Sequence, residues 1–290
     1  MVREGFRLSS YDVEDYGTNR WNLLGFLVKP GEKVFIKPNM IAEKHKWKND
    51  WNYVITNGSL IRVIIGYLFL AMQGKGTVMI GDAPQIDSKY WEIVRLMGLR
   101  EARQLFSSFD SFNTELINLQ DEYWVTKDDV YIDTIPLPGD PRCSVIFDLG
   151  KSNYSSEPDG KNVKYYGAHY NIEETNKARS QCKHIYAIAK SPIIADVFIS
   201  LPKLKTHKKC CITVNLKGLV DTNANKNYLP HYQFGGSEVG GDQFDKTHIK
   251  REMENYFVTR MKKRLLSRSM VAQFLSRELK KIAYKIFGGT

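Results

Sequence analysis

The sequence predicts an α/β protein with a mostly parallel sheet and flanking helices, and three observations lead to this class. Lys33–Lys37 is typical of a strand, the apolar run over 60–72 of a helix, and Thr77–Ile80 of a second strand. Strand, helix and strand in this order form a βαβ unit, whose strands are parallel with a right-handed crossover. Ile193–Leu201 is expected to add a further buried strand to the same sheet.

Local signals define the ends of these elements. Pro38 and Asn39 end the first strand, and Asn57–Ser59 supplies a cap for the helix that begins near Leu60. Gly74–Gly76 ends that helix. Further elements are expected as a helix at Tyr90–Phe106 and short strands at Tyr131–Leu137, Ser144–Leu149 and Ile212–Leu216.

The pattern divides the chain into an α/β domain over 1–249 and a helical segment over 250–290. An inserted loop region is expected near 151–170, and Thr222–His248, rich in Asn and Gly, is expected to form a mobile flap. The last segment is a basic amphipathic helix by its spacing of apolar and Lys/Arg residues. The segment ends at Gly288-Gly-Thr290, and the family resemblance given below implies that it is truncated there.

The positive charge is concentrated at one end of the chain. The formal net charge is +10; residues 250–290 hold eleven Lys/Arg and three Glu, which is +8 and leaves +2 for residues 1–249. This distribution argues against nucleic acid as a partner of the whole protein. The basic helix is expected to pack with its lysines in solvent, with binding to an anionic membrane surface as the alternative.

Composition and cysteine use favour a globular cytoplasmic protein. The chain is 42% apolar and 12% aromatic, enough for a core. Its four cysteines are too few and too irregular for a disulfide framework, and no C-x-x-C pair occurs, so we expect reduced thiols and no metal. The N-terminus lacks the apolar core of a signal peptide, and the run over 60–72 is too short to span a bilayer. A membrane-peripheral location through 250–290 is the alternative.

Charged and polar side chains follow three of the predicted strands at the point where each strand ends. Because ligands bind beyond the carboxyl ends of parallel strands, we expect these side chains to share one rim. They are Lys37 and Asn39 after the first strand, Asp82 after the second, and Lys203, Lys205 and His207 after the later one. Such a group of ammonium ions favours a carboxylate or a phosphate, and the helix start at Ser59 would add backbone N–H donors.

Each candidate has a functional and a structural interpretation. In the functional one, Lys37, Lys203, Lys205 and Lys217 neutralise an anion, with Asn39 and Ser59 also binding it. His207 acts as general acid or base, Asp82 orients a cation or a hydroxyl, and Asp221 is a counter-charge. His231 swings over the ligand from the flap. In the structural one, the lysines are solvated, Asp82 forms a turn and His231 is a surface residue; for Cys210 and Cys211, buried filler is favoured over a nucleophile or metal ligand.

Five stretches carry a resemblance to a known family: Val34–Asn39, Asn57–Leu60, Thr77–Pro84, Ala195–His207 and Val214–Leu219. They resemble the domain of unknown function 362 family. The same outline is distantly similar to the substrate-binding half of the nickel-dependent lactate racemase family, where a strand-end histidine and a following lysine work near the substrate or cofactor. That similarity implicates His207 and Lys217.

The resemblance implies an enzyme with redox or isomerase chemistry. Many members carry ferredoxin-type cysteine clusters, and this chain has none, so any cofactor is expected to be supplied separately and its identity is unknown. The functional hypothesis is an enzyme that binds a small anionic substrate or cofactor at the strand-end rim. The alternative is a non-catalytic, membrane-peripheral protein that binds an anion or lipid.

Overall fold

The computed structural model describes most of the first 246 residues and a few beyond them. The described residues are 2–45, 50–127, 130–150, 164–167, 171–179, 183–207, 211–243, 245–246, 253, 274, 278 and 282. The chain forms two compact units: unit 1 is Met1–Gln120, Pro138–Ser144 and Ala189–Ala224, and unit 2 is Asp121–Leu137, Val145–Ile188 and Asn225–Thr290. Most of 250–290 lies outside the described residues, so the basic helix and the boundary at 249 stay predictions.

Unit 1 is built on a parallel sheet of four strands. The strands are β1 (Lys33–Pro38), β2 (Gly76–Asp82), β3 (Phe112–Asn118) and β9 (Val197–Leu201), in the order β3-β2-β1-β9. Each neighbouring pair is parallel. The helix α2 (Gly58–Ala71) connects β1 to β2. The predicted βαβ unit and α/β class are therefore confirmed.

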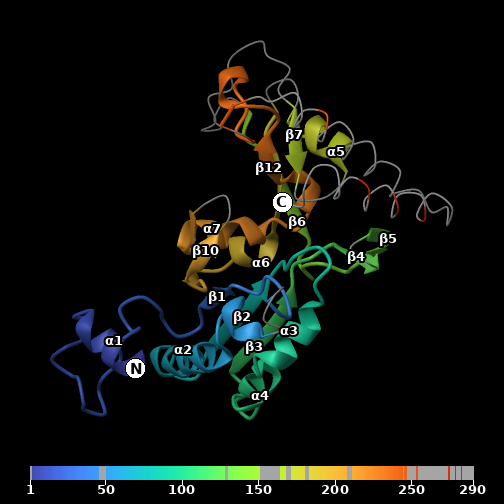
Figure 1. Ribbon diagram of the computed structural model, residues 1–290. Helices are drawn as coiled ribbons and strands as arrows, with labels where there is room; N and C mark the ends of the chain where they lie inside the picture. Colours follow the sequence, from blue (N-terminus) through green and yellow to red (C-terminus); the bar gives the residue numbers. More distant parts are fainter. Residues whose placement is uncertain are drawn as a thin grey trace. The chain divides into compact units, whose positions relative to one another are not determined.

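Three helices cover one face of this sheet and bury the main core. The helices are α2, α3 (Tyr90–Leu96) and α4 (Leu99–Gln104), which lie beside β1, β2 and β3 in Figure 1. Alternate strand residues such as Ile36 and Ile80 pack with Ile65 of α2, all essentially inaccessible to solvent. Each such side chain contributes about 1.5–3 kcal/mol by its burial. The core holds the strands, and with them the strand ends, in a fixed register.

The single helix predicted over Tyr90–Phe106 is wrong, because the structure breaks it into α3 and α4. Gly98 lies between them with φ of 63°, a left-handed conformation that ends one helix and caps the next. A residue without a Cβ adopts this conformation at low cost. Met97, just before it, remains in the core.

The expectation of a buried strand over Ile193–Leu201 is also corrected. Residues Lys190–Ile193 form the short helix α6, so β9 starts only at Val197. The strand order places β9 at the edge of the sheet, and its residues are half-buried or exposed; Phe198 keeps 36% of its surface in solvent. An edge strand has a neighbour on one side only, which accounts for the lower burial.

Beyond β9, unit 1 continues with a small hairpin and two short helical turns. These are β10 (Lys205–His207), antiparallel to β11 (Cys211–Thr213), then α7 (Asn215–Leu219) and the 3₁₀ turn η3 (Val220–Thr222). The predicted strand over Ile212–Leu216 is thus split between β11 and α7. Cys211 is exposed, so the expectation that it is buried filler is wrong; Cys210 lies outside the described residues.

Unit 2 consists of small antiparallel pairs and short helices. The pairs are β4 (Glu122–Lys127) with β5 (Val130–Pro136), β6 (Ser144–Asp148) with β8 (Ile185–Ala189), and β7 (Tyr165–Gly167) with β12 (Pro230–Gln233). Further elements among the described residues are α5 (Ile172–Lys177), η4 (Lys226–Tyr228) and η5 (Ser237–Val239) in unit 2, and α1 (Val2–Leu8) and η1 (Trp51–Tyr53) in unit 1. The predicted flap over Thr222–His248 contains β12, and its mobility stays a prediction.

Within the part of the chain that the structure describes, no helix combines the length and the apolarity needed to cross a bilayer.

Candidate functional site at the strand ends of unit 1

A buried ion pair joins the ends of the two central strands. Lys37 is near the end of β1 and Asp82 is the last residue of β2, so parallel pairing brings them side by side. The Lys37 Nζ and Asp82 Oδ1 atoms are 2.6 Å apart, and the two side chains are 0% and 1% exposed. Lys37 also donates to the Pro38 carbonyl at 2.9 Å, and the Met40 N–H donates to Asp82 Oδ2 at 2.6 Å.

Some parts of the environment of Asp82 raise the pKa of its carboxyl group and others lower it. Burial raises the pKa of Asp82 above its ordinary value, the Lys37 ammonium lowers it, and the Asp221 carboxylate raises it. Lys37 is the cation that offsets the cost of burying this carboxylate. Because both side chains are buried, each is the main electrostatic partner of the other. A ligand at the rim would interact with this pair only indirectly, through the neighbouring residues.

A threonine links the ends of β1 and β9. The Asn39 N–H donates to Thr56 Oγ1 at 2.9 Å, and the Thr56 hydroxyl donates to the Leu201 carbonyl at 2.7 Å. Asn39 is 4% exposed, and its side-chain Oδ1 has no hydrogen-bond partner among the described residues. Sequence reasoning missed Thr56. Its place directly before the helix cap is the signal that could have pointed to it.

The predicted cap of α2 is confirmed at Asn57. Its Oδ1 accepts hydrogen bonds from the Ser59 N–H at 3.0 Å and from the Ser59 hydroxyl at 2.7 Å. An Asn at this position satisfies a helix N–H that has no intrahelical acceptor. Ser59 is exposed, and its hydroxyl is held by the cap.

The segment after β9 lies near the ends of the other strands, and the contacts of Lys205 show this. Its Nζ donates to the Val54 carbonyl at 2.8 Å. Burial lowers the pKa of Lys205 to about 8; Asp221 and Asp82 act to raise this value, and Lys217 and Lys203 to lower it. The four groups therefore lie within electrostatic reach of one ammonium, although they come from different elements.

His207 belongs to the same cluster. Burial lowers its pKa, with Lys217 and Lys205 lowering it further and Asp221 opposing them. A lowered pKa means that the imidazole is neutral at pH 7 and can accept a proton. His207 lies opposite Cys211 in the β10–β11 register.

Asp221 is the carboxylate that sequence reasoning expected as a counter-charge beside Lys217. The structure places it at the end of β2, where the Ala83 N–H donates to the Asp221 carbonyl at 3.1 Å. The residue is 8% exposed. This hydrogen bond fixes η3, and with it the Asp221 side chain, at the strand-end rim.

The predicted site residues therefore separate into a cluster and two outlying positions. The cluster contains Lys37, Asn39, Asp82, Lys203, Lys205, His207 and Lys217. Ser59 lies at the start of α2. His231 belongs to β12 in unit 2, so its predicted role as a cover for the ligand stays a prediction. Over the described ranges, no group of three or more His, Cys, Asp and Glu side chains is arranged to hold a metal ion.

The fold and the charged cluster together define unit 1 as an α/β unit in which charged side chains lie at the carboxyl ends of a parallel sheet. Residues 147–273 match a family model described as "Domain of unknown function (DUF362)". Over these residues the match agrees with the resemblance predicted from the sequence. The match includes Ala195–His207 and Val214–Leu219; the resemblance over 34–39, 57–60 and 77–84, and that to the lactate racemase family, stay expectations. A search of curated proteins found no match, and neither did a search of solved structures.

Proposed function

We propose that the strand-end cluster of unit 1 binds a small anion that carries a carboxylate or phosphate, and that the chain is an enzyme. The observation that carries the proposal is the balance of charge around Lys205. Four cations, Lys37, Lys203, Lys205 and Lys217, face two carboxylates, Asp82 and Asp221, so four minus two leaves +2. A divalent anion would neutralise this excess.

The ligand contacts are assigned to the outer lysines. Lys37 already has Asp82 at 2.6 Å, which cancels its charge inside the protein. Lys203, Lys205 and Lys217 are only partly buried. Their mutual repulsion contributes to the lowered pKa of Lys205, and an anion among them would relieve that repulsion. These three lysines are therefore more accessible to a ligand than Lys37, and carboxylates inside the protein compensate their charge less completely.

His207 is the residue proposed to move a proton. It is neutral at pH 7 for the reasons given above, so it can act as a general base toward a substrate held by Lys205 and Lys217. A bound anion would raise its pKa and strengthen it as a base. The family resemblance favours isomerase or redox chemistry, in which the removal of a proton next to a carboxylate is a common step; the cofactor is not assigned.

Calorimetry with inorganic phosphate and with oxalate tests the binding step. Lys205→Gln and Lys217→Gln should each weaken binding about tenfold or more, since each removes a charged hydrogen-bond donor. Lys75→Gln is the matched control, because Lys75 is exposed just before β2, at the opposite end of that strand from Asp82. Failure of both anions to bind, or equal affinity in all variants, would refute the proposal.

A further inference from the structure

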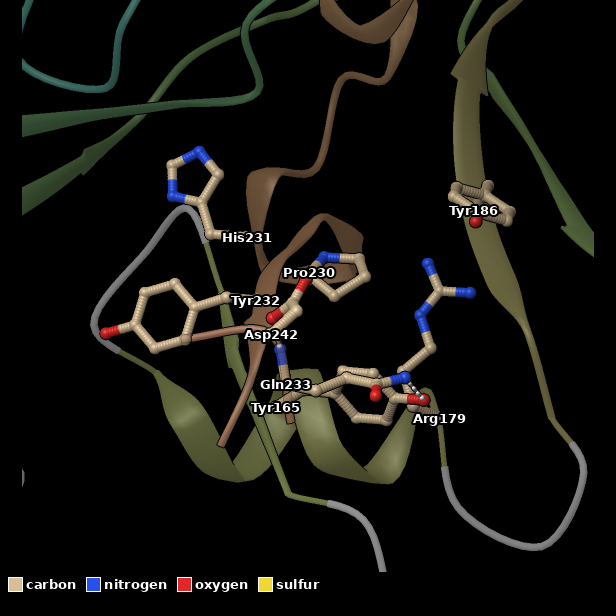
Figure 2. A pocket seen from close by; sticks show the side chains of 8 residues that line it. All are labelled: Tyr165, Arg179, Tyr186, Pro230, His231, Tyr232, Gln233 and Asp242. Atoms are coloured by element: carbon tan, nitrogen blue, oxygen red, sulfur yellow. Dashed lines mark hydrogen bonds between the residues drawn. The ribbon is translucent and has the colours of Figure 1, made fainter. Parts of the chain in front are cut away.

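Unit 2 contains a pocket that the proposed function does not use. Its volume is about 200 Å³. Three of its eight lining residues are tyrosines, Tyr165 from β7, Tyr186 from β8 and Tyr232 from β12, and Figure 2 shows them on different sides of Pro230. The polar lining residues are Arg179, His231, Gln233 and Asp242. Aromatic walls with a few polar groups are typical of small-molecule sites.

An irregularity in β12 places consecutive residues on the same pocket. In the antiparallel pairing with β7, Pro230 lies opposite Gly167 and Tyr232 opposite Tyr166, so His231 is an extra residue. Successive side chains of a regular strand point to opposite faces. The bulge interrupts this alternation, and residues 230 to 233 all line the pocket. Bulges often redirect side chains next to binding sites.

The aromatic walls are fixed by contacts outside the pocket. The ring of Tyr232 packs on Tyr166 with centroids 4.8 Å apart, and Tyr166 also stacks on Phe234 at 4.9 Å. The backbone of Tyr165 exchanges two hydrogen bonds with the Asn176 side chain, at 2.8 and 2.9 Å. A ligand would therefore meet preformed surfaces and would not have to order them.

The pocket carries one charge of each sign at different depths. Arg179 is 4% exposed; it donates to the Tyr228 carbonyl at 2.7 Å, and its guanidinium lies 4.1 Å from the centroid of the Tyr186 ring. Asp242 is exposed, and its Oδ1 accepts the Gln233 N–H at 2.5 Å. The positive charge is thus held inside and the negative charge on the solvent side.

We propose that this pocket binds a small zwitterion with a planar ring, such as an aromatic amino acid. Its carboxylate would face Arg179, its ammonium Asp242, and its ring the tyrosines. The pocket volume of about 200 Å³ is below the range of about 300–1,000 Å³ that is typical of pockets for drug-sized molecules. The pocket therefore fits a smaller ligand, such as an amino acid. This second site does not depend on the anion site of unit 1.

Ligand-observed NMR with three probes tests the charge arrangement on the full chain. Phenylalanine carries both charges, 3-phenylpropionate lacks the ammonium and phenethylamine lacks the carboxylate. We expect phenylalanine to bind tightest, 3-phenylpropionate about threefold more weakly, and phenethylamine about tenfold more weakly, because the buried charge contributes more than the exposed one. If none of the three binds, or phenethylamine binds as tightly as phenylalanine, the proposal is wrong.

Two variants assign the binding to this pocket. Asp242→Asn keeps the oxygen that accepts the Gln233 N–H and removes the charge, so phenylalanine should bind no better than 3-phenylpropionate. Tyr186→Leu removes the ring beneath Arg179 and should weaken all ligands that retain the carboxylate. Lys183→Gln, on an exposed residue before β8, is the matched control. Unchanged affinities in both variants would overturn the assignment, whatever the result for phosphate at unit 1.

Discussion

Lys37, near the end of β1, and Lys205, the first residue of β10, both interact electrostatically with Asp82, yet their surroundings differ. Lys37 is fully buried with the Asp82 carboxylate 2.6 Å away. Lys205 is partly exposed, its ammonium is bonded to a carbonyl, and further cations surround it. The first lysine has its counter-charge inside the protein, whereas the second is still surrounded by excess positive charge. The same residue type therefore supports the fold in one position and is suited to a ligand in the other.

The largest expected effect is on stability, from breaking the internal pair. Lys37→Met should lower the free energy of unfolding by about 3–5 kcal/mol, because it leaves a buried carboxyl group without its cation. Urea denaturation measures the change. Lys33→Met is the matched control, since Lys33 is the exposed first residue of the same strand; its effect should be small. A loss below about 1 kcal/mol for Lys37→Met would mean that the pair is not structural.

The stability of the same variant should also depend on pH. Lys37 lowers the pKa of Asp82, so its removal raises that pKa further above the unfolded value of about 4. Between the two pKa values the folded state binds more protons, and the free energy of unfolding falls as pH rises, by up to about 1.4 kcal/mol per pH unit. Lys37→Met/Asp82→Asn should lose this slope. A slope that persists in the double variant would assign it to another group.

Lys205 should affect stability at alkaline pH instead. Its folded pKa of about 8 is below the unfolded value of 10.5, so between these two pH values the unfolded state binds more protons. The free energy of unfolding should therefore rise with pH in this window, by about 1 kcal/mol after allowance for solvent screening. Lys205→Met should remove the rise. An unchanged alkaline profile in this variant would contradict the lowered pKa.

The smallest expected effect comes from the counter-charge. Asp221→Asn removes a carboxylate that faces Lys205 and should tighten phosphate binding about threefold in calorimetry. Asp110→Asn, an exposed residue just before β3, should leave the affinity unchanged. Weaker phosphate binding in Asp221→Asn would show that Asp221 positions the site more than it opposes the anion.

The sequence was sufficient for the parts of unit 1 that depend on local signals. Apolar runs and the Asn57 cap predicted β1, α2 and β2, and parallel strands necessarily bring Lys37 and Asp82 to the same edge. Whether two charged side chains form an internal ion pair or remain accessible to a ligand depends on distances of a few ångströms. Sequence spacing does not determine such distances. The same is true of Thr56, whose hydrogen bonds reach residues 17 and 145 positions away.

Features that depend on contacts between distant parts of the chain were not predicted from the sequence. Gly98 breaks a helix whose apolar spacing continues through it, and β9 is at an edge because of strand order and not because of its composition. The pocket of unit 2 depends on the pairing of β7 with β12, which are more than 60 residues apart, and on a bulge at His231. The sequence singled out His231 as a cover for a ligand at the strand ends of unit 1, and it predicted neither this pocket nor the tyrosines that line it.

NMR titration of the Lys205 side chain with and without phosphate tests whether the cations around Lys205 bind an anion. Selective ¹³C labelling of lysine gives the signal, and its absence in Lys205→Gln assigns it. We predict a pKa of about 8 in the free protein and a clear rise when phosphate is bound. A pKa that is the same in saturating phosphate would contradict the account.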